Sequence, residues 1–248
     1  MSGWPGWRRI PVKGSSVADM RRYLLSLKLT RRRLAPVALL LVTLLLAACG
    51  VANNEPATCD SPTHLFLDDF NGEKDCGWAV YYGGNDRATI ENSSMRITAS
   101  QPGQLRWTNP GRVFDDAIIS VEARQVSGPN DNAYGVICRY QNEKNFYVFL
   151  ISGDGYYTIG KYQSGVENVT YLTENGQFQP SDAIHTGVAS NEMRVSCIGN
   201  QLSLEVNGVP LVTVTDPTFV TGDIGLAAGT LAAGTTVVEF DDVQVIAP

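Results

Sequence analysis

The chain carries at residues 134–162 the stretch YGVICRYQNEKNFYVFLISGDGYYTIGKY, which decides its fold. β-Branched and aromatic residues fill three runs here, and two turn-forming segments separate them, QNEKN at 141–145 and SGDG at 152–155. Such runs, bounded by Asn, Asp, Gly and Ser, are a strong strand signal in a single sequence. The stretch therefore predicts three antiparallel strands joined by two short turns.

The lengths of these turns predict a register. The predicted pairs are Tyr140–Phe146, Arg139–Tyr147, Cys138–Val148, Ile137–Phe149 and Val136–Leu150 across the first turn, and Ile151–Tyr156, Leu150–Tyr157, Phe149–Thr158 and Val148–Ile159 across the second. Because side chains alternate along a strand, two faces separate. The predicted core face carries Val136, Cys138, Tyr140, Phe146, Val148, Leu150, Tyr157 and Ile159. The other face carries Arg139, Tyr147, Phe149, Ile151, Tyr156, Thr158 and Tyr162, and it is either covered by another part of the protein or exposed as a binding surface.

The rest of the chain shows the same short, alternating runs. Further strands are predicted at 64–70, in a hairpin at 88–100, at 105–110, 117–126, 169–172 and 209–216, and at 236–246, whereas GDIGLAAGT at 222–230 is predicted to be a glycine-rich corner. No amphipathic helix of useful length is present. About a dozen strands with frequent turns predict an all-β protein, one antiparallel β-sandwich (jelly roll) of two curved sheets over residues 61–248.

The late hairpin MRVSCIGNQLSLEVNG, residues 193–208, has the clearest pattern. A turn at Gly199–Asn200 pairs Cys197 with Leu202, Val195 with Leu204 and Met193 with Val206 on one face. The opposite face pairs Arg194 with Glu205 and Ser196 with Ser203, which is a complementary cross-strand set.

The N-terminus predicts export. Six cations between Arg21 and Arg33 precede the apolar run LAPVALLLVTLLLAA at 34–48, which is short for a spanning helix. Its end, LAAC, resembles the lipobox of bacterial lipoproteins, so residues 1–48 are predicted to be a leader and signal peptide, with Met20 as an alternative start. Cys49 is then the lipidation site, and residues 49–60 form a polar tether. The alternative is an uncleaved signal anchor.

Charge excludes one class of partner. Nine of the 19 cations lie in the leader, so the 200 residues from Cys49 onward carry 10 Lys and Arg against 24 Asp and Glu, a formal charge of 10 − 24 = −14. Nucleic-acid binding needs a cationic surface, and this domain is therefore not expected to bind nucleic acid.

Four cysteines follow Cys49. An even number in an exported chain favours disulfides, and four cysteines allow three connectivities. We favour Cys59–Cys76, which clips the N-terminal loop, and Cys138–Cys197, which ties two core strands; buried free thiols are the alternative. No C-x-x-C pair exists, and the two histidines are isolated, so a metal site built on them is not expected.

Several landmarks in order resemble a known superfamily. They are LDDFNG with Gly77–Trp78, AYGVICRYQNEKNFYVFLIS, MRVSCIGNQLSLEVNG, GDIGLAAG and EFDDVQV, and they extend from Leu65 to Ile246. This set resembles the concanavalin A-like lectin/glucanase superfamily, especially the laminin-G-like and 3-keto-disaccharide-hydrolase-like jelly rolls of bacterial lipoproteins. The resemblance implies two curved sheets with ligands on the concave one.

The implied ligand is a sugar, because aromatic rings stack on its apolar faces and polar groups bind its hydroxyls. The candidate ligand-binding residues are Arg139, Tyr147, Tyr156, Tyr162, Arg194 and Glu205. The alternative is that these rings only pack for stability, and Trp78 and Trp107 are expected in the core or at its rim.

Laminarinase-type members also imply a structural calcium ion, whose positions fall on Asp69 and Asp241; the alternative is two solvated strand ends. Their catalytic E-x-D-x-x-E strand is missing, since the nearest segment begins at Glu239 but has Gln244 in the last position. No other catalytic motif and no further cofactor site is found.

Three functions remain open. The first is a non-catalytic carbohydrate-binding module, held by its lipid on the extracytoplasmic face of a bacterial membrane. The second is a glycoside hydrolase of keto-disaccharide or laminarinase-like type with unassigned catalytic residues. The third is a structural or protein-interaction domain of the cell envelope.

Overall fold

The computed structural model describes residues 59–72 and 74–248. The leader at 1–48, the alternative start at Met20, the lipidation site Cys49 and the tether up to residue 58 lie outside the described residues. None of the described residues forms a helix long and apolar enough to cross a membrane.

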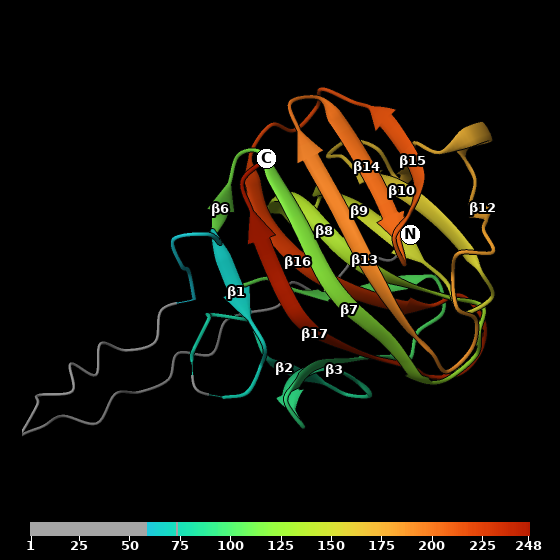
Figure 1. Ribbon diagram of the computed structural model, residues 1–248. Coiled ribbons are helices and arrows are strands. Elements are labelled where there is room, and N and C mark those ends of the chain that lie inside the picture. Colours follow the sequence, from blue (N-terminus) through green and yellow to red (C-terminus); the bar gives the residue numbers. More distant parts are fainter. Residues whose placement is uncertain (1–58, 73) are drawn as a thin grey trace, which may run out of the picture. The chain divides into compact units, whose positions relative to one another are not determined.

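The described strands form two antiparallel sheets (Figure 1). The nine-stranded sheet holds, in spatial order, β15 (Val209–Thr215), β14 (Gln201–Val206), β13 (Ser190–Ile198), β7 (Ala117–Ser127), β17 (Thr236–Ile246), β4 (Ser94–Ala99), β3 (Asp86–Glu91) and β2 (Tyr81–Gly83), with β1 (Phe66–Asp68) beside β17. The seven-stranded sheet holds β11 (Thr170–Tyr171), β10 (Tyr156–Tyr162), β9 (Asn145–Ile151), β8 (Asn132–Asn142), β16 (Gly222–Thr230) and β6 (Val113–Phe114), with β12 (Gln179–Pro180) beside β10. Outside both sheets lie β5 (Gln104–Thr108) and a 3₁₀ turn, η1 (Glu174–Gly176). The predicted all-β sandwich is confirmed.

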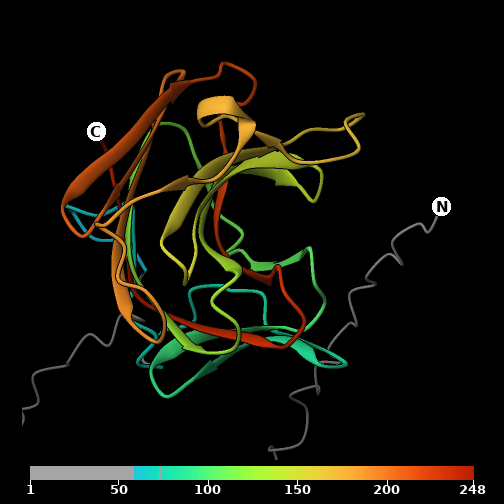
Figure 2. The same ribbon diagram turned by 90° about the vertical axis from the view of Figure 1, so that its right-hand side faces the viewer.

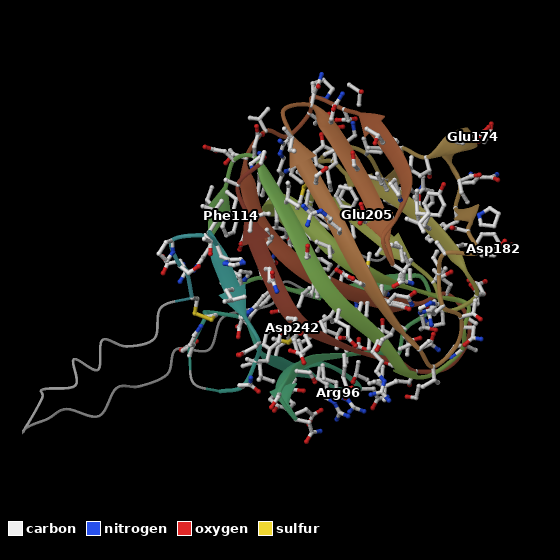
Figure 3. All side chains as sticks on the ribbon, in the orientation of Figure 1. Arg96, Phe114, Glu174, Asp182, Glu205 and Asp242 are labelled. Atoms are coloured by element: carbon white, nitrogen blue, oxygen red, sulfur yellow. A yellow bond between two sulfur atoms is a disulfide. The ribbon has the colours of Figure 1, made fainter. Side chains whose placement is uncertain are left out.

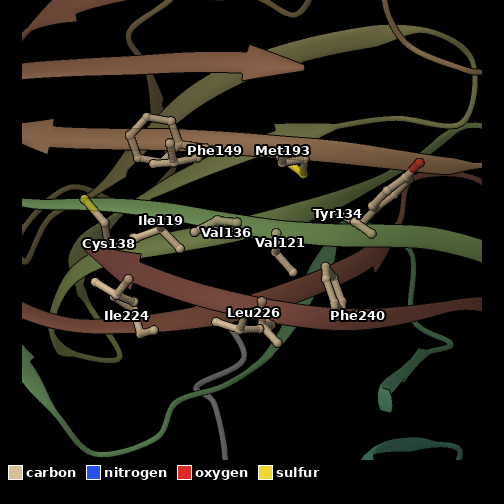
Figure 4. Close-up of a cluster of buried hydrophobic side chains, with 14 of the residues drawn as sticks. Ile119, Val121, Tyr134, Val136, Cys138, Phe149, Met193, Ile224, Leu226 and Phe240 are labelled. Atoms are coloured by element: carbon tan, nitrogen blue, oxygen red, sulfur yellow. The ribbon is translucent and has the colours of Figure 1, made fainter. Parts of the chain in front are cut away.

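The core lies between the two sheets (Figure 2). Strand β7 shows how the sequence builds it, because Val121 and Ala123 point inward while Glu122 and Arg124, which alternate with them, are exposed. Figure 4 shows side chains of both sheets meeting there. Those of the nine-stranded sheet are Ile119, Val121, Met193 and Phe240, and those of the seven-stranded sheet are Tyr134, Val136, Cys138, Phe149, Ile224 and Leu226. Each such aliphatic or aromatic side chain contributes ~1.5–3 kcal/mol when it is fully buried.

The late hairpin forms as predicted. Strands β13 and β14 pair in the predicted register, with Cys197 opposite Leu202 and Arg194 opposite Glu205. The inward residues of both strands are buried, and the intervening ones face outward.

The predicted register of the central meander is wrong by one residue at each hairpin. Cys138 lies opposite Tyr147 rather than Val148, and Ile151 lies opposite Tyr157 rather than Tyr156. The cause in the first hairpin is a bulge, since β8 holds three residues, 139–141, where β9 holds only Phe146. The turn itself is then just Glu143–Lys144.

This slip turns β9 over, because a shift of one residue exchanges the two faces of a strand. Tyr147, Phe149 and Ile151 therefore face the core, and Phe146, Val148 and Leu150 face outward. The second one-residue shift cancels the first, so the two predicted faces of β10 are correct. Tyr157 and Ile159 face the core, and Tyr156, Thr158 and Tyr162 face outward. Tyr140, within the bulge, faces outward, contrary to the prediction.

The segment GDIGLAAGT is a central strand and not a corner. It forms β16, every residue of which is buried. Gly225 and Gly229 are required because β5 crosses over them: a Cβ on Gly225 would lie 2.5 Å from Asn109 Nδ2 and 2.8 Å from the carbonyl oxygen of Thr108. Glycine composition suggested a bend, whereas the structure uses it to bring a crossing strand close.

Both favoured disulfides are confirmed. Cys59–Cys76 closes the loop that begins the domain, and Cys138–Cys197 joins β8 of one sheet to β13 of the other. The second bond therefore connects the two layers of the sandwich.

Candidate functional site

Arg139 is buried inside the sandwich, so its assignment to an exposed ligand face is wrong. It lies in the bulge of β8 with a φ of 52°. Its Nη1 donates to the carbonyl oxygens of Gly199 and Phe219, both at 2.7 Å, and its Nη2 lies 3.1 Å from Asp116 Oδ1. The side chain is 1% exposed. This cation holds three connecting segments together and does not reach solvent.

Tyr147 is also inside, which is a second correction. Its hydroxyl donates to Asp216 Oδ1 at 2.6 Å and accepts from the Phe219 amide at 3.1 Å. Burial raises the pKa of Tyr147 to about 12. Burial also acts to raise the pKa of Asp216, but hydrogen bonds from Lys161, Thr218 and Tyr147 outweigh it and lower that pKa to about 2. Tyr147 and Tyr156 thus lie on opposite sides of their sheet, and the face predicted to contain both does not exist.

Arg194 and Glu205 lie on the outer face of the other sheet. They are cross-strand partners, and Arg194 Nη1 donates to Ser120 Oγ at 3.4 Å. Figure 3 marks Glu205 on β14. The structure therefore does not bring these two residues together with the predicted tyrosines.

Tyr156 and Tyr162 remain on the outward face of the seven-stranded sheet. Tyr156 is 40% exposed at the sheet edge, opposite Pro180. Tyr162 is half-buried and stacks on Phe146, with 4.4 Å between ring centroids and 17° between ring planes. Burial raises the pKa of Tyr162 to about 12.

Tyr162 belongs to a group of rings that we call the aromatic platform: Trp107, Tyr140, Phe146 and Tyr162. Phe146 is fully buried at its centre, 5.5 Å from Trp107 and 5.5 Å from Tyr140 by ring centroids. Trp107, Tyr140 and Tyr162 are half-buried around it. The rings come from β5, β8, β9 and β10, so four separate segments build one surface.

Local structure explains how the platform is positioned. The β8 bulge turns Tyr140 outward, and the register of β9 and β10 places Phe146 opposite Tyr162. Trp107 is held by β5, whose neighbouring Arg106 bonds Asp86 Oδ2 at 2.6 Å in a mostly buried ion pair. Sequence reasoning missed Tyr140 and Phe146 because both depend on the bulge, which no local motif marks.

Asp223 lies next to the platform. It pairs with Tyr140 across β16 and β8, and the carboxylate of Asp223 adds to the rise in the pKa of Tyr140 that burial causes. Asp223 Oδ2 accepts from the Gly111 amide and Oδ1 from the Ile224 amide, both at 2.8 Å. Burial raises the pKa of Asp223 to about 6 in spite of these hydrogen bonds. A carboxyl group with such a pKa, beside rings, is a candidate functional group.

The calcium prediction gains no support from the geometry. Burial raises the pKa of Asp241, and the charges of Asp242, Glu122 and Asp69 add to the effect, so Asp69 and Asp241 do lie near each other. However, no group of three or more His, Cys, Asp or Glu side chains in the described residues could hold a metal. Calcium takes six to eight oxygen ligands. A structural ion at this place stays a prediction.

The site can therefore do two things chemically. Half-buried rings offer π faces for the apolar side of a sugar, and the hydroxyls of Tyr140 and Tyr162 with the Asp223 carboxyl offer hydrogen-bonding groups. A single carboxyl with a raised pKa can also exchange a proton near neutral pH.

Comparison with solved structures shows the same fold. A carbohydrate-binding module, CBM66 of Bacillus subtilis, is similar over 69% of this chain and 96% of its own, with 15% identity and a TM-score of 0.53. A GH16 protein of the mixed-linkage glucan locus of Bacteroides ovatus, solved with a product, is similar over 73% and 100%, with 12% identity and a TM-score of 0.52. The β-glucanase of Bacillus licheniformis covers 74% and 98%, with 11% identity and a TM-score of 0.52. At these identities the likeness establishes the fold alone, which is that of carbohydrate-binding modules and glycoside hydrolases.

Comparison with curated protein sequences gives no match. The family described as the 3-keto-alpha-glucoside-1,2-lyase-like domain matches residues 66–246, which is nearly the whole described sandwich. The resemblance drawn from the sequence landmarks is thereby confirmed, and this chain belongs to the 3-keto-alpha-glucoside-1,2-lyase-like domain family.

Proposed function

We propose that this domain binds glycans without cleaving them, and that the aromatic platform is the binding surface. The observation that carries the proposal is a set of half-buried rings on the outward face of the seven-stranded sheet, with Asp223 beside it. Trp107, Tyr140 and Tyr162 are only half-buried, so part of each ring stays accessible to a ligand. The names of the structural neighbours, a carbohydrate-binding module and two glucan-directed proteins, support the same ligand class.

The test is a glycan array probed with residues 59–248, which contain both sheets and both disulfides. Trp107→Ala and Tyr162→Ala are expected to weaken binding ~10-fold each, because one lost stacking contact costs up to ~1.5 kcal/mol. Tyr82→Ala is the matched control, since Tyr82 is a tyrosine 78% exposed on β2, in the other sheet. Binding that survives both platform substitutions, or is lost equally with Tyr82→Ala, would refute the choice of surface.

A second candidate is elimination on 3-keto-α-glucosides, favoured by the family and by the position and pKa of Asp223. In such a step the Asp223 carboxylate takes the proton on C2, which the C3 ketone acidifies. The C1–C2 double bond forms, the bond from C1 to the leaving oxygen breaks, and that oxygen takes the proton that Asp223 removed from C2. A base with a pKa near the working pH suits this role.

Release of the aglycone from a 3-keto-α-glucoside separates the two candidates. Turnover by the wild type that Asp223→Asn abolishes would establish the lyase. Binding of the same sugar without turnover would favour the binding module. Turnover that persists in Asp223→Asn would remove Asp223 from the mechanism.

We further propose that the protein is exported and anchored through a lipid on Cys49, on the extracytoplasmic face of a bacterial membrane. The basic leader, the apolar run at 34–48 and the LAAC sequence support this location. Incorporation of radiolabelled palmitate that Cys49→Ser abolishes is the expected result. Labelling that is unchanged in Cys49→Ser would overturn the anchor.

A further inference from the structure

The seven-stranded sheet contains unusually few charged residues. Within its strands as the structure describes them, these are Arg139, Lys161 and Asp223. Arg139 and Lys161 face the interior of the sandwich, where they pair with Asp116 and Asp216 at 3.1 and 2.6 Å. Asp223 faces outward with Tyr140. The platform side of this sheet therefore has one formal charge on its strands, and that charge is negative.

The groups around Asp223 do not reverse its sign. Arg112, on the segment before β6, attracts the carboxylate, but its guanidinium lies over the Phe66 ring at 5.4 Å from the centroid. Glu143, in the β8–β9 turn, is a second negative charge near Tyr140. The next residue, Lys144, carries the opposite charge, and both residues are exposed. The amides of Gly111 and Ile224 are already engaged by the carboxylate.

We propose that Asp223 determines the charge class of the ligand: the platform accepts neutral sugars and rejects those that carry a carboxylate. This inference rests on the proposed glycan binding and names the substrate class of the same site. A uronic acid ring stacked on the platform brings its carboxylate near the buried negative charge of Asp223. The two cations of the sheet, Arg139 and Lys161, do not offset this charge, because they pair with Asp116 and Asp216 on the other face.

The size of the discrimination follows from Coulomb's law. Two unit charges ~6–8 Å apart, at an effective dielectric constant near 20, repel enough to weaken binding by roughly 30- to 100-fold. Salt reduces this effect, and at physiological ionic strength we expect at least a ~10-fold preference for the neutral sugar.

The experiment compares each neutral hexose oligosaccharide retained on the array with the same oligosaccharide after oxidation of its primary alcohols to carboxylates. Calorimetry at pH 7.5 is expected to show the ~10-fold preference. At pH 5 the preference should shrink, because Asp223 gains a proton near pH 6 while a uronate with an ordinary pKa near ~4 stays charged. In Asp223→Asn the preference should be small at both pH values.

Glu205→Gln is the matched control, because it removes the same charge from the outer face of the other sheet. The measured quantity is the ratio of two affinities on one sample, so a loss of folded protein does not change it. The pH series on the wild type tests the role of Asp223 without any substitution. Equal affinities at pH 7.5, or a preference that Asp223→Asn leaves intact, would overturn the inference while glycan binding stands. Failure to bind any glycan would instead overturn the proposed function, and this inference with it.

Discussion

Replacing Asp223 by asparagine is expected to remove a pH-dependent part of the free energy of unfolding. Asp223 is 7% exposed, and burial raises its pKa from 3.8 to about 6 in the folded protein. Because the folded pKa lies above the unfolded one, the folded state binds the proton more tightly. The stabilisation from that proton is fully present below pH ~3.8 and is lost as the pH rises through 6.

The magnitude follows from the two pKa values. A pKa difference of one is worth ~1.4 kcal/mol, so the full effect is ~3 kcal/mol. The wild type should lose ~2.5 kcal/mol of it between pH 4 and 7, because the unfolded carboxyl is already more than half ionised at pH 4. Asparagine has one acceptor oxygen for two amides, those of Gly111 and Ile224, and the amide left without a partner costs ~1–3 kcal/mol at every pH. The variant is therefore expected to be the less stable protein at pH 4, and its free energy of unfolding should rise by ~2.5 kcal/mol relative to the wild type by pH 7.

Urea unfolding followed by tryptophan fluorescence, with the disulfides intact, measures this difference at pH 4, 5, 6 and 7. Other titratable groups are common to both proteins, so their contributions cancel in the difference. A gap between the two proteins that stays constant from pH 4 to 7 would show that Asp223 is not held in an environment that disfavours its charge.

Three further predictions concern the scaffold. Replacing Cys138 and Cys197 together by alanine opens a loop of 59 residues and should lower the free energy of unfolding by ~4 kcal/mol, which a lower urea midpoint would show. An unchanged midpoint would mean that the bond does not constrain the unfolded chain. Tyr147→Phe should lower the free energy of unfolding by ~1–3 kcal/mol, because Asp216 loses a buried hydrogen-bond donor, and it should leave glycan affinity unchanged. Weakened binding with unchanged stability would contradict the interior position of Tyr147. Gly225→Ala should lower the stability by ~1–3 kcal/mol, because the new methyl group meets β5, and a neutral result in thermal unfolding would show that β5 does not press on β16.

The sequence predicts the architecture well because the architecture depends on local patterns. The Gly199–Asn200 turn and the strict alternation from Met193 to Val206 determine a register with one solution, and the structure has it. The disulfide between Cys138 and Cys197 follows from the same logic, since both residues lie on inward positions of core strands.

The candidate site is less predictable because it depends on one irregular position. The bulge at Arg139 leaves no local signature, since arginine is not a residue that favours a φ of 52°. Long-range contacts with Asp116, Gly199 and Phe219 hold that conformation, and a single sequence does not reveal them. The shift in register that it causes places Phe146, and not Tyr147, on the outward face. The sequence therefore predicted the wrong side chains for the site.

Strand β5 belongs to neither sheet, although it supplies Trp107 to the aromatic platform. It is anchored by the Arg106–Asp86 pair and by the Thr108 hydroxyl, which donates to the carbonyl oxygen of Ala79, and it rests on Gly225 and Gly229 of β16. Insertions or deletions in the segments that lead into and out of it can shift the tryptophan without breaking any ladder hydrogen bond of the sandwich. Under the proposed function, the position of Trp107 could therefore be altered through these two segments while the strand pairing of both sheets is kept.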